Sequence, residues 1–380
     1  MGTRANSEGE AYFGNWEMYL QELDLKKMKL IGQCKSVWQG AMRNAYWPEG
    51  PHLYKKDGYY YILTAEGGTE RNHSIMISRS KTLWGPYEGA PQNPILTHRH
   101  LGNDFPVQCV GHGDFFHTPE NDWYIVMLGM RPCKGYTSLG RETFLAKVEW
   151  ENDWPVVNKG IGRLEENVIL PDSTDKEPKS IEKNVYGFRD GLLTYNVISL
   201  RGGLCAADST ARSGWLRLHA KSESFLTTCP ISLIGVRQKD YHYSVRTKME
   251  FEPRTLHDKA GMVLFQNEES NLTIYKKYHS EGNLLTVESN IGGQNSVIAQ
   301  VMVHQDILEI KFVARDQKGE LLFRYEGDKD FHLLAENIDL RSYSTEAAGG
   351  FTGCILGVFV FGNHNVSADF KYLIYEAFAI

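Results

Sequence analysis

Two segments in the first half of the chain repeat one pattern of strands and turns. Residues 52–67 (HLYKKDGYYYILTAEG) and 114–130 (DFFHTPENDWYIVMLGM) each place aromatic-rich strands on both sides of a polar turn. Each hairpin is followed by a strand and a Gly-Pro or Trp-Pro corner, in residues 74–88 and 143–157. The two turns lie about 64 positions apart, and a β-unit repeating at about 60 residues predicts four-stranded propeller blades. Coincidental similarity between meander strands is the alternative.

The second half shows short strands without this repeat. Residues 241–251 (YHYSVRTKMEF) place apolar and aromatic side chains at every second position, which is typical of a half-buried strand. Residues 307–325 predict a hairpin with its turn at Asp316–Gly319. Residues 260–266 and 372–378 predict further strands, and no amphipathic helix of three turns is visible. Such a pattern favours a β-sandwich.

A polar segment separates the two halves. Residues 170–184 (LPDSTDKEPKSIEKN) are rich in charge and contain two prolines, so we interpret residues 171–184 as a linker. The predicted domains are therefore residues 1–170 and 185–380.

Composition excludes several classes of function. The 41 basic and 47 acidic residues give a net charge of −6, which argues against nucleic-acid and anionic-membrane partners. No stretch approaches about 18 apolar residues, so we expect no transmembrane helix. The first residues lack an apolar signal segment, and three N-x-[ST] sequons leave the compartment open between extracellular and cytoplasmic. Six scattered cysteines without a C-x-x-C pair are expected to be small buried hydrophobes.

One carboxylate stands in unusual local surroundings. Residues 47–54 (WPEGPHLY) place Glu49 between two prolines and beside aromatic side chains. Apolar surroundings disfavour the charged form of a carboxyl group, which suits a general acid. A solvent-exposed turn glutamate is the alternative interpretation.

Two further residues join Glu49 as candidates. His112, in the GHGD segment that opens the second repeat, is equivalent in the repeat to Glu49, so both should point toward one axial region of a propeller. Arg141, in LGRETF, could hold substrate hydroxyls or a carboxylate. A hydrogen-bonded structural histidine and a structural ion pair are the respective alternatives.

Other polar or aromatic groups carry weaker signals. Aromatic side chains near the candidates could stack on a sugar ring: Tyr46, Trp47, Phe105 and Tyr136. His98 and His100 lack further ligands at metal spacing and are expected in a loop. The glycines of AEGGT, from Glu66 to Thr69, are not followed by a phosphate-binding lysine, and no G-x-S-x-G motif occurs.

Taken together, these motifs resemble glycoside hydrolase family 43. The resemblance is to β-xylosidase and α-L-arabinofuranosidase members with a C-terminal concanavalin-like β-sandwich. It is carried in the first half by three long stretches, residues 47–69, 93–116 and 139–158. In the second half it is carried by five shorter ones: GWLRLHAK, RQKDYHYSVRTKMEFEP, AGMVLFQN, FTGCILGVFV and ADFKYLIYEA.

The resemblance implies both a fold and a chemistry. It implies an all-β fold, a partial five-bladed β-propeller followed by a concanavalin A-like β-sandwich. It also implies inverting hydrolysis of terminal xylosyl or arabinofuranosyl residues, with Glu49 as general acid and a xylo- or arabino-oligosaccharide as substrate. His112 would lie at the channel centre, where members hold water or a calcium ion, and no other cofactor is implied. Arg141 would contact sugar hydroxyls, and Phe351 would reach the pocket from the sandwich.

The sequence departs from the family in its first blades. Inversion needs a second carboxylate on the opposite face of the sugar ring. In the family this base, and a third carboxylate that tunes the acid, precede the stretch at which this chain starts to match, and residues 1–23 contain no aspartate. We therefore expect an N-terminally truncated member in which Glu49 can protonate a leaving group but nothing activates water, with a large loss of rate. Asp104 and Asp114 belong to other motifs.

Three interpretations remain open from the sequence. The chain is a glycosidase represented by its C-terminal part, a non-catalytic carbohydrate-binding protein, or a degenerate product with open sheet edges. Open edges and exposed apolar faces predict poor solubility, or association with a chain that supplies the missing blades or with a second copy.

Overall fold

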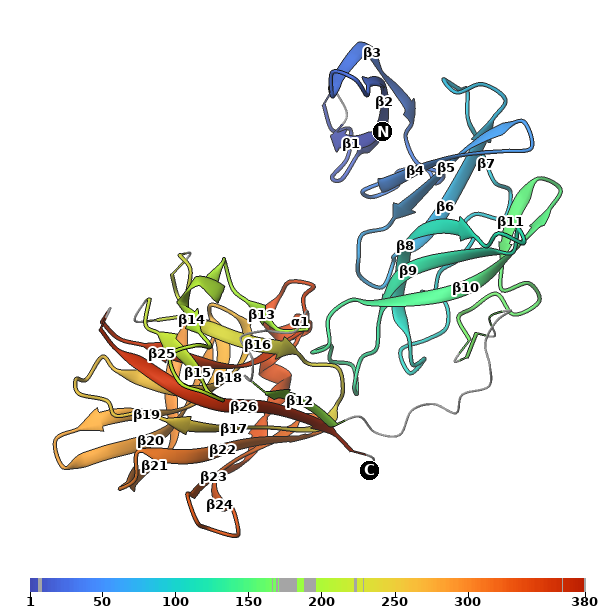
Figure 1. The fold of residues 1–380 in the computed structure, drawn as a ribbon. Helices are drawn as coiled ribbons and strands as arrows, with labels where there is room; N and C mark the ends of the chain where they lie inside the picture. Colours follow the sequence, from blue (N-terminus) through green and yellow to red (C-terminus); the bar gives the residue numbers. More distant parts are fainter. Residues whose placement is uncertain are drawn as a thin grey trace. The chain divides into compact units, whose positions relative to one another are not determined.

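The structure is a computed structural model built almost entirely of antiparallel strands (Figure 1). It describes residues 1–5, 9–165, 167–168, 170, 183–187, 196–221, 224–227, 229–363 and 365–378. Two compact units divide the chain, one of residues 1–135 and 141–174 and the other of residues 136–140 and 175–380. The all-β fold class, a partial five-bladed propeller followed by a concanavalin-like sandwich, is confirmed.

Three antiparallel sheets make up unit 1, and each runs in chain order. The first contains β1 (Gly2–Ala5), β2 (Trp16–Asp24) and β3 (Lys29–Trp38). The second contains β4 (Glu49–Lys56), β5 (Tyr59–Glu66), β6 (Ser74–Ser80) and β7 (Glu88–Gly89). The third contains β8 (Gln108–His117), β9 (Trp123–Met130), β10 (Glu142–Glu151) and β11 (Trp154–Val157).

The second and third sheets are the two repeated blades, and they share one core. Alternate residues of their inner strands are fully buried, among them Leu63, Ile75 and Ile125 at 0% exposure. The β4–β5 turn uses Asp57 and Gly58, both with positive φ, as a two-residue hairpin turn requires. These packed blades form a rigid base for the loops and strand ends that they carry.

The first sheet differs from the other two in its exposure. β2 begins with buried residues, but the first eight residues of β3 are exposed. Several large apolar side chains of this hairpin face solvent within the described unit: Leu23, Leu25, Met28, Leu30 and Ile31.

Two larger sheets make up unit 2. One runs in the order β14 (Ala207–Asp208), β15 (Leu216–His219), β26 (Ser367–Ala377), β17 (His242–Glu250), β22 (Ile307–Arg315), β23 (Lys318–Tyr325), β24 (His332–Asp339), with β12 (Lys183–Gly187) also on β26. The other runs in the order β13 (Ile198–Ser199), β16 (Leu233–Arg237), β25 (Ile355–Phe361), β18 (Lys259–Asn267), β19 (Ser270–His279), β20 (Gly282–Ile291), β21 (Gln294–Val303). The short helical elements are η1 (Gly203–Ala206), η2 (Leu340–Tyr343) and α1 (Thr345–Ala348).

The core of unit 2 lies between these two sheets. The period-two face predicted for residues 241–251 is confirmed in β17, where Tyr243, Val245 and Met249 are 0% exposed. Every second residue of β18 and β25 meets them from the opposite sheet. Burial of this apolar surface is the main stabilisation of a sandwich.

Several sequence predictions have a definite outcome. The predicted hairpin forms, although its turn is only Asp316 and Gln317 because β23 already begins at Lys318. The prediction of buried cysteines is wrong for most of them: Cys354 is buried, while Cys34, Cys205 and Cys229 are exposed.

Residues 171–182 of the predicted linker lie outside the described residues, and its last two residues belong to β12. Among the described residues, no helix has the length and apolar character needed to cross a membrane.

Candidate active site

Glu49 is the first residue of β4, at a break in the regular strand pairing. It pairs with Ala65 of β5, and the register then shifts before His52. Gly50 lies within this shift with φ of +57°. A bulge of this kind re-aims the side chains beside it, as bulges next to active sites commonly do.

Trp47 fixes the segment that leads into Glu49. Its backbone N–H donates to the carbonyl of Gly14 at 2.8 Å. A Cβ atom built at Gly14 or at Gly68 would lie 2.9 Å or 2.7 Å from the indole ring, so the ring is held between two glycines. The indole therefore packs within the fold, between Gly14 and Gly68, and is not a free surface for stacking on a sugar ring.

His112 meets the β4 bulge from the neighbouring blade. It lies in β8, between two register shifts and with φ of +54°. A Cβ atom built at Gly50 would lie only 2.3 Å from His112 Nε2, so the imidazole packs directly on the glycine. The structure therefore brings the Glu49 and His112 motifs together, as the repeat predicted.

The protonation of His112 follows from its surroundings. Burial lowers its pKa, the Glu49 carboxylate opposes this shift, and His52 and Arg141 add to it. The charges of Glu49 and Arg141 therefore both act on this ring. At neutral pH the imidazole is therefore uncharged and can both donate and accept a hydrogen bond.

His73 lies next to this layer and is a functional candidate that sequence reasoning missed. It is 1% exposed, and its Nδ1 is 2.9 Å from the carbonyl oxygen of Cys109. Its ring packs against Gly111, where a Cβ atom would lie 2.4 Å away. Burial lowers its pKa to about 4, so the ring is neutral and Nδ1 donates to that carbonyl. Among the described residues, Nε2 has no hydrogen-bond partner.

Arg141 precedes β10 and is exposed. Its Nη1 lies 3.5 Å from Thr69 Oγ1, and its charge acts on both His73 and His112. The AEGGT segment, which sequence reasoning set aside, thus supplies a side chain to the same site. The sequence feature that could have indicated this segment is the pair of glycines directly after Glu66. Both glycines have positive φ, which lets the backbone turn sharply beneath Trp47.

Glu66, at the start of AEGGT, supports the loop that leads to Glu49. It is 2% exposed, and its Oε1 accepts a hydrogen bond from the N–H of Ala41 at 2.7 Å. Among the described residues its Oε2 has no partner, and burial raises its pKa to about 7. The adjacent Gly67 N–H donates to the carbonyl of Tyr46 at 2.8 Å. Glu66 is therefore a positioning residue for the segment before Glu49.

Two aspartates, Asp114 and Asp104, belong to other motifs of unit 1. Asp114 Oδ1 accepts from the Tyr54 hydroxyl at 2.5 Å and lies 3.3 Å from His52 Nδ1. The Tyr54 hydroxyl also accepts from the N–H of Phe115 at 2.9 Å, so this group braces one blade against the next. Asp104 is exposed. Asp114 is therefore held by Tyr54 and His52, and neither aspartate is assigned as a base.

The remaining candidates lie elsewhere. Phe351 belongs to unit 2 and is 38% exposed, and its part in the site stays a prediction. Phe105 packs on His98, whose Nε2 accepts from the N–H of Leu164 at 3.0 Å, so that histidine is structural. Tyr136 also belongs to unit 2.

Comparison with known proteins identifies the family of this chain. The model of glycosyl hydrolases family 43 matches residues 5–155. A xylosidase/arabinosidase of Butyrivibrio fibrisolvens is 42% identical over 381 residues, which cover 99% of this chain and 73% of that protein. The chain belongs to glycosyl hydrolase family 43. Members of this family are glycosidases, and so is this chain.

Other similarities of this family 43 chain extend over both units. The β-xylosidase C-terminal concanavalin A-like domain matches residues 205–376. A β-xylosidase of Bacillus subtilis is 32% identical, over 94% of this chain and 70% of that protein. The crystal structure of a xylan β-1,4-xylosidase from Bacillus halodurans superposes with a TM-score of 0.89 at 31% identity, covering 97% of this chain and 72% of that one.

The calcium ion implied by the resemblance can be tested against the residues of this family 43 site. Calcium prefers six to eight oxygen ligands. His112 has one carboxylate acting on it, Glu49, and the positive charge of Arg141 acts on it as well. The described residues contain no group of three histidine, cysteine or acidic side chains placed to hold a metal. These residues alone do not fit calcium.

Proposed function

We propose that this family 43 chain acts on terminal xylosyl or arabinofuranosyl residues of xylan-derived oligosaccharides, with Glu49 as general acid. The observation that supports this most strongly is the meeting of the Glu49 bulge with the neutral His112 ring and the Arg141 charge. A terminal pentosyl ring bound there would place its leaving oxygen against the Glu49 carboxyl group. Glu49 then gives its proton to that oxygen as the C1–O bond breaks.

The other residues have binding roles in this proposal. The Arg141 guanidinium donates to sugar hydroxyls, and Thr69 beside it limits its orientation. His112 stays neutral, so it binds a hydroxyl without adding a second cation next to Arg141. His73 and Glu66 act through the backbone that carries these groups.

The role of the general base, which activates water, is not assigned to any described residue. An inverting reaction needs a base about 6.5–9.5 Å from the acid. Asp114 is bound to Tyr54 and His52, and Glu66 is buried against the Ala41 backbone. This observation favours, as a second candidate function, saccharide binding without turnover.

The role of Glu49 is tested with aryl β-xyloside and aryl α-arabinofuranoside substrates. Glu49→Gln should lower the rate by about 10²–10⁴-fold for poor leaving groups. The loss should be far smaller for dinitrophenyl glycosides, whose leaving group needs no proton. Glu120→Gln, at an exposed turn of the same unit, is the matched control. Equal rates for Glu49→Gln and Glu120→Gln would refute the assignment.

The state of the base is tested separately with azide. Azide attacks C1 without needing a base, while Glu49 protonates the departing oxygen, and the product is a pentosyl azide. A rate that rises with azide shows a working acid without its base. Hydrolysis unaffected by azide shows that a base is present. Binding of xylo-oligosaccharide with neither product supports the non-catalytic alternative.

The partner expected from the sequence stays part of this proposal. The apolar side chains that β2, β3 and their turn expose, such as Leu25 and Leu30, are where a chain that completes the ring, or a second copy, would pack. Light scattering of the chain alone, compared with Leu25→Lys/Leu30→Lys, tests this. A monomer in both cases rules out self-association.

A further inference from the structure

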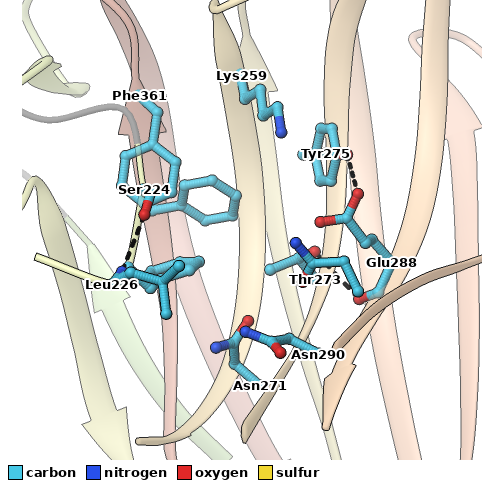
Figure 2. A pocket seen from close by; sticks show the side chains of 12 residues that line it. Ser224, Leu226, Lys259, Asn271, Thr273, Tyr275, Glu288, Asn290 and Phe361 are labelled. Atoms are coloured by element: carbon cyan, nitrogen blue, oxygen red, sulfur yellow. Dashed lines mark hydrogen bonds between the residues drawn. The ribbon is translucent and has the colours of Figure 1, made fainter. Parts of the chain in front are cut away.

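A pocket lies on the outer face of the seven-stranded sheet of unit 2 (Figure 2). Strand alternation determines which residues reach it. On β19, Leu272 and Ile274 point into the sandwich core, so Asn271, Thr273 and Tyr275 point outward. An outward face normally meets water and needs no burial, yet all three of these side chains are 5% exposed or less.

One wall of the pocket is aromatic. Phe225 comes from the segment before β16, and Phe359 and Phe361 come from the outer face of β25. Their ring centroids lie 4.7–5.1 Å apart, so they form a continuous apolar surface. The ring planes are tilted to one another by 50–71°, so ring edges and faces together offer an apolar surface to the C–H groups of a ligand.

Side-chain amides form the opposite end. Asn271, Asn290 and Asn295 are paired in register across β19, β20 and β21, so they lie on one face. Asn290 is 7% exposed, and its Nδ2 lies 3.3 Å from the carbonyl oxygen of Glu268. Among the described residues, its Oδ1 has no hydrogen-bond partner. A buried acceptor left unpaired is costly unless a ligand or water donates to it.

A third group completes the pocket beside the aromatic wall. The Tyr275 hydroxyl donates to Glu288 Oε2 at 2.8 Å, and Lys259 Nζ lies 5.0 Å from the Tyr275 ring centroid. Figure 2 shows Lys259 and Tyr275 at one end of the pocket and the two asparagines at the other. The pocket therefore offers acceptors, one ammonium donor and an apolar wall together.

The chemistry of the lining selects a class of ligand. The Glu288 carboxylate and the amide oxygens disfavour an anion, and the same polar groups disfavour an acyl chain. A sugar ring has hydroxyl groups that both donate and accept, and a C–H face for the aromatic wall. The pocket volume of about 120 Å³ is well below the roughly 300–1,000 Å³ of pockets that hold drug-sized ligands, so the pocket suits one small ring.

We propose that this pocket is a second saccharide-binding site, which holds one sugar ring of a longer chain and is separate from the Glu49 site. It lies wholly in unit 2, so its binding does not depend on hydrolysis in unit 1. The choice of xylan-type saccharides as probes rests on the proposed function, whereas the pocket itself requires only a sugar ring.

The test measures binding of xylohexaose and cellohexaose to the full chain by calorimetry, in a Glu49→Gln background that prevents turnover. Asn290→Leu should lower the affinity of one class of site at least about tenfold, because a hydroxyl loses its acceptor. Lys259→Met removes the ammonium group from the pocket lining without changing a residue of the hydrophobic core. Lys277→Met, directly opposite on β19 and outside the lining, is its matched control.

The outcomes separate this proposal from that for Glu49. The proposal is supported if Asn290→Leu or Lys259→Met weakens or removes one class of site for either hexasaccharide, while Lys277→Met retains that class of site. In chains that keep Glu49, the same pocket variants should hydrolyse aryl xyloside at the parental rate. The proposal is overturned if folded Lys259→Met and Asn290→Leu chains bind both hexasaccharides as the parent does, or if the parent has a single class of site that Arg141→Ala abolishes.

Discussion

Replacing Gly50 by alanine is the most direct test of how the Glu49 and His112 motifs are joined. Gly50 has φ of +57°, and its missing Cβ leaves the space that the His112 ring fills. Alanine therefore adds two separate costs, one from the backbone and one from overlap with the ring. Gly58, in the turn at the end of the same strand, has φ of +77° and nothing within 4 Å of its Cβ position. Gly58→Ala thus carries the backbone cost alone.

The magnitudes follow from these two costs. An alanine in the left-handed region costs about 1 kcal/mol, which is the full effect expected for Gly58→Ala. At Gly50 the new methyl would lie 2.3 Å and 2.6 Å from two ring atoms of His112, well inside the contact distance of about 3.5–4.0 Å. Relief of such overpacking costs about 1–3 kcal/mol more. The ring must move by roughly 1 Å, and a displacement of that size lowers a catalytic rate by about 100-fold.

The assay is urea unfolding followed by tryptophan fluorescence. Only Trp215 of the eight tryptophans lies in unit 2, so the signal reports chiefly on unit 1. We expect a loss of about 2–4 kcal/mol for Gly50→Ala against about 1 kcal/mol for Gly58→Ala. In a His112→Ala background the extra cost of Gly50→Ala should disappear. If Gly50→Ala and Gly58→Ala are equally stable and equally active, the contact between Gly50 and the His112 ring does not position the site.

Three further predictions concern buried polar groups. Burial lowers the pKa of His73 from 6.5 to about 4. Between these two pH values the unfolded chain binds a proton that the folded chain does not, so the free energy of unfolding falls by up to about 3 kcal/mol as the pH drops from 6.5 to 4. His73→Gln should abolish this pH dependence in urea unfolding. Burial raises the pKa of Glu66 from 4.5 to about 7, so stability instead falls as the pH rises through that window, and Glu66→Gln should remove this loss, also about 3 kcal/mol. Lys276 is 0% exposed, and its Nζ donates to Asp306 and to two backbone carbonyls, one of them that of Phe251 at 2.7 Å. Lys276→Met should therefore lower the free energy of unfolding of unit 2, measured by calorimetry, by about 2–4 kcal/mol. Asp306→Asn should cost much less, because Asp306 is 57% exposed. A pH slope unchanged in either unit 1 variant, or a Lys276→Met transition at the parental temperature, would contradict the corresponding argument.

Sequence periodicity predicted the regular parts of the fold. The inward face of β17 and the hairpin of β22 and β23 follow from alternation, since a buried face must be apolar at every second position. The same rule does not predict whether a residue on the outward face is exposed to solvent or covered by another segment. Asn271 lies in an N-x-[ST] sequon, yet it is 4% exposed because the segment with Phe225 covers that face, and no local pattern reveals such a cover.

The candidate site was predictable only as far as the repeat extends. Equivalence between blades predicted that the Glu49 and His112 motifs share one region, and in the structure the His112 ring packs on Gly50, next to Glu49. His73, Glu66 and Thr69 were missed because they lie in or beside the loop between β5 and β6, where residues follow no period. Their contribution depends on contacts with another blade, such as that between His73 and the Cys109 carbonyl, which are non-local in the sequence.

The positions where alternation fails are also the positions where the site is built. Gly50, Cys109 and His112 all have positive φ at the starts of β4 and β8, and the two non-glycine residues cost about 1–3 kcal/mol each in that conformation. Such strain persists only when the surrounding structure imposes it, and directly beneath these strand starts Ile75 and Ile125 leave no room for a Cβ at Gly113. His112 lies between the two register shifts of β8, and its ring packs on Gly50. The packing of the blades therefore offsets the backbone strain at the start of β8, where His112 meets Gly50 beside the candidate acid.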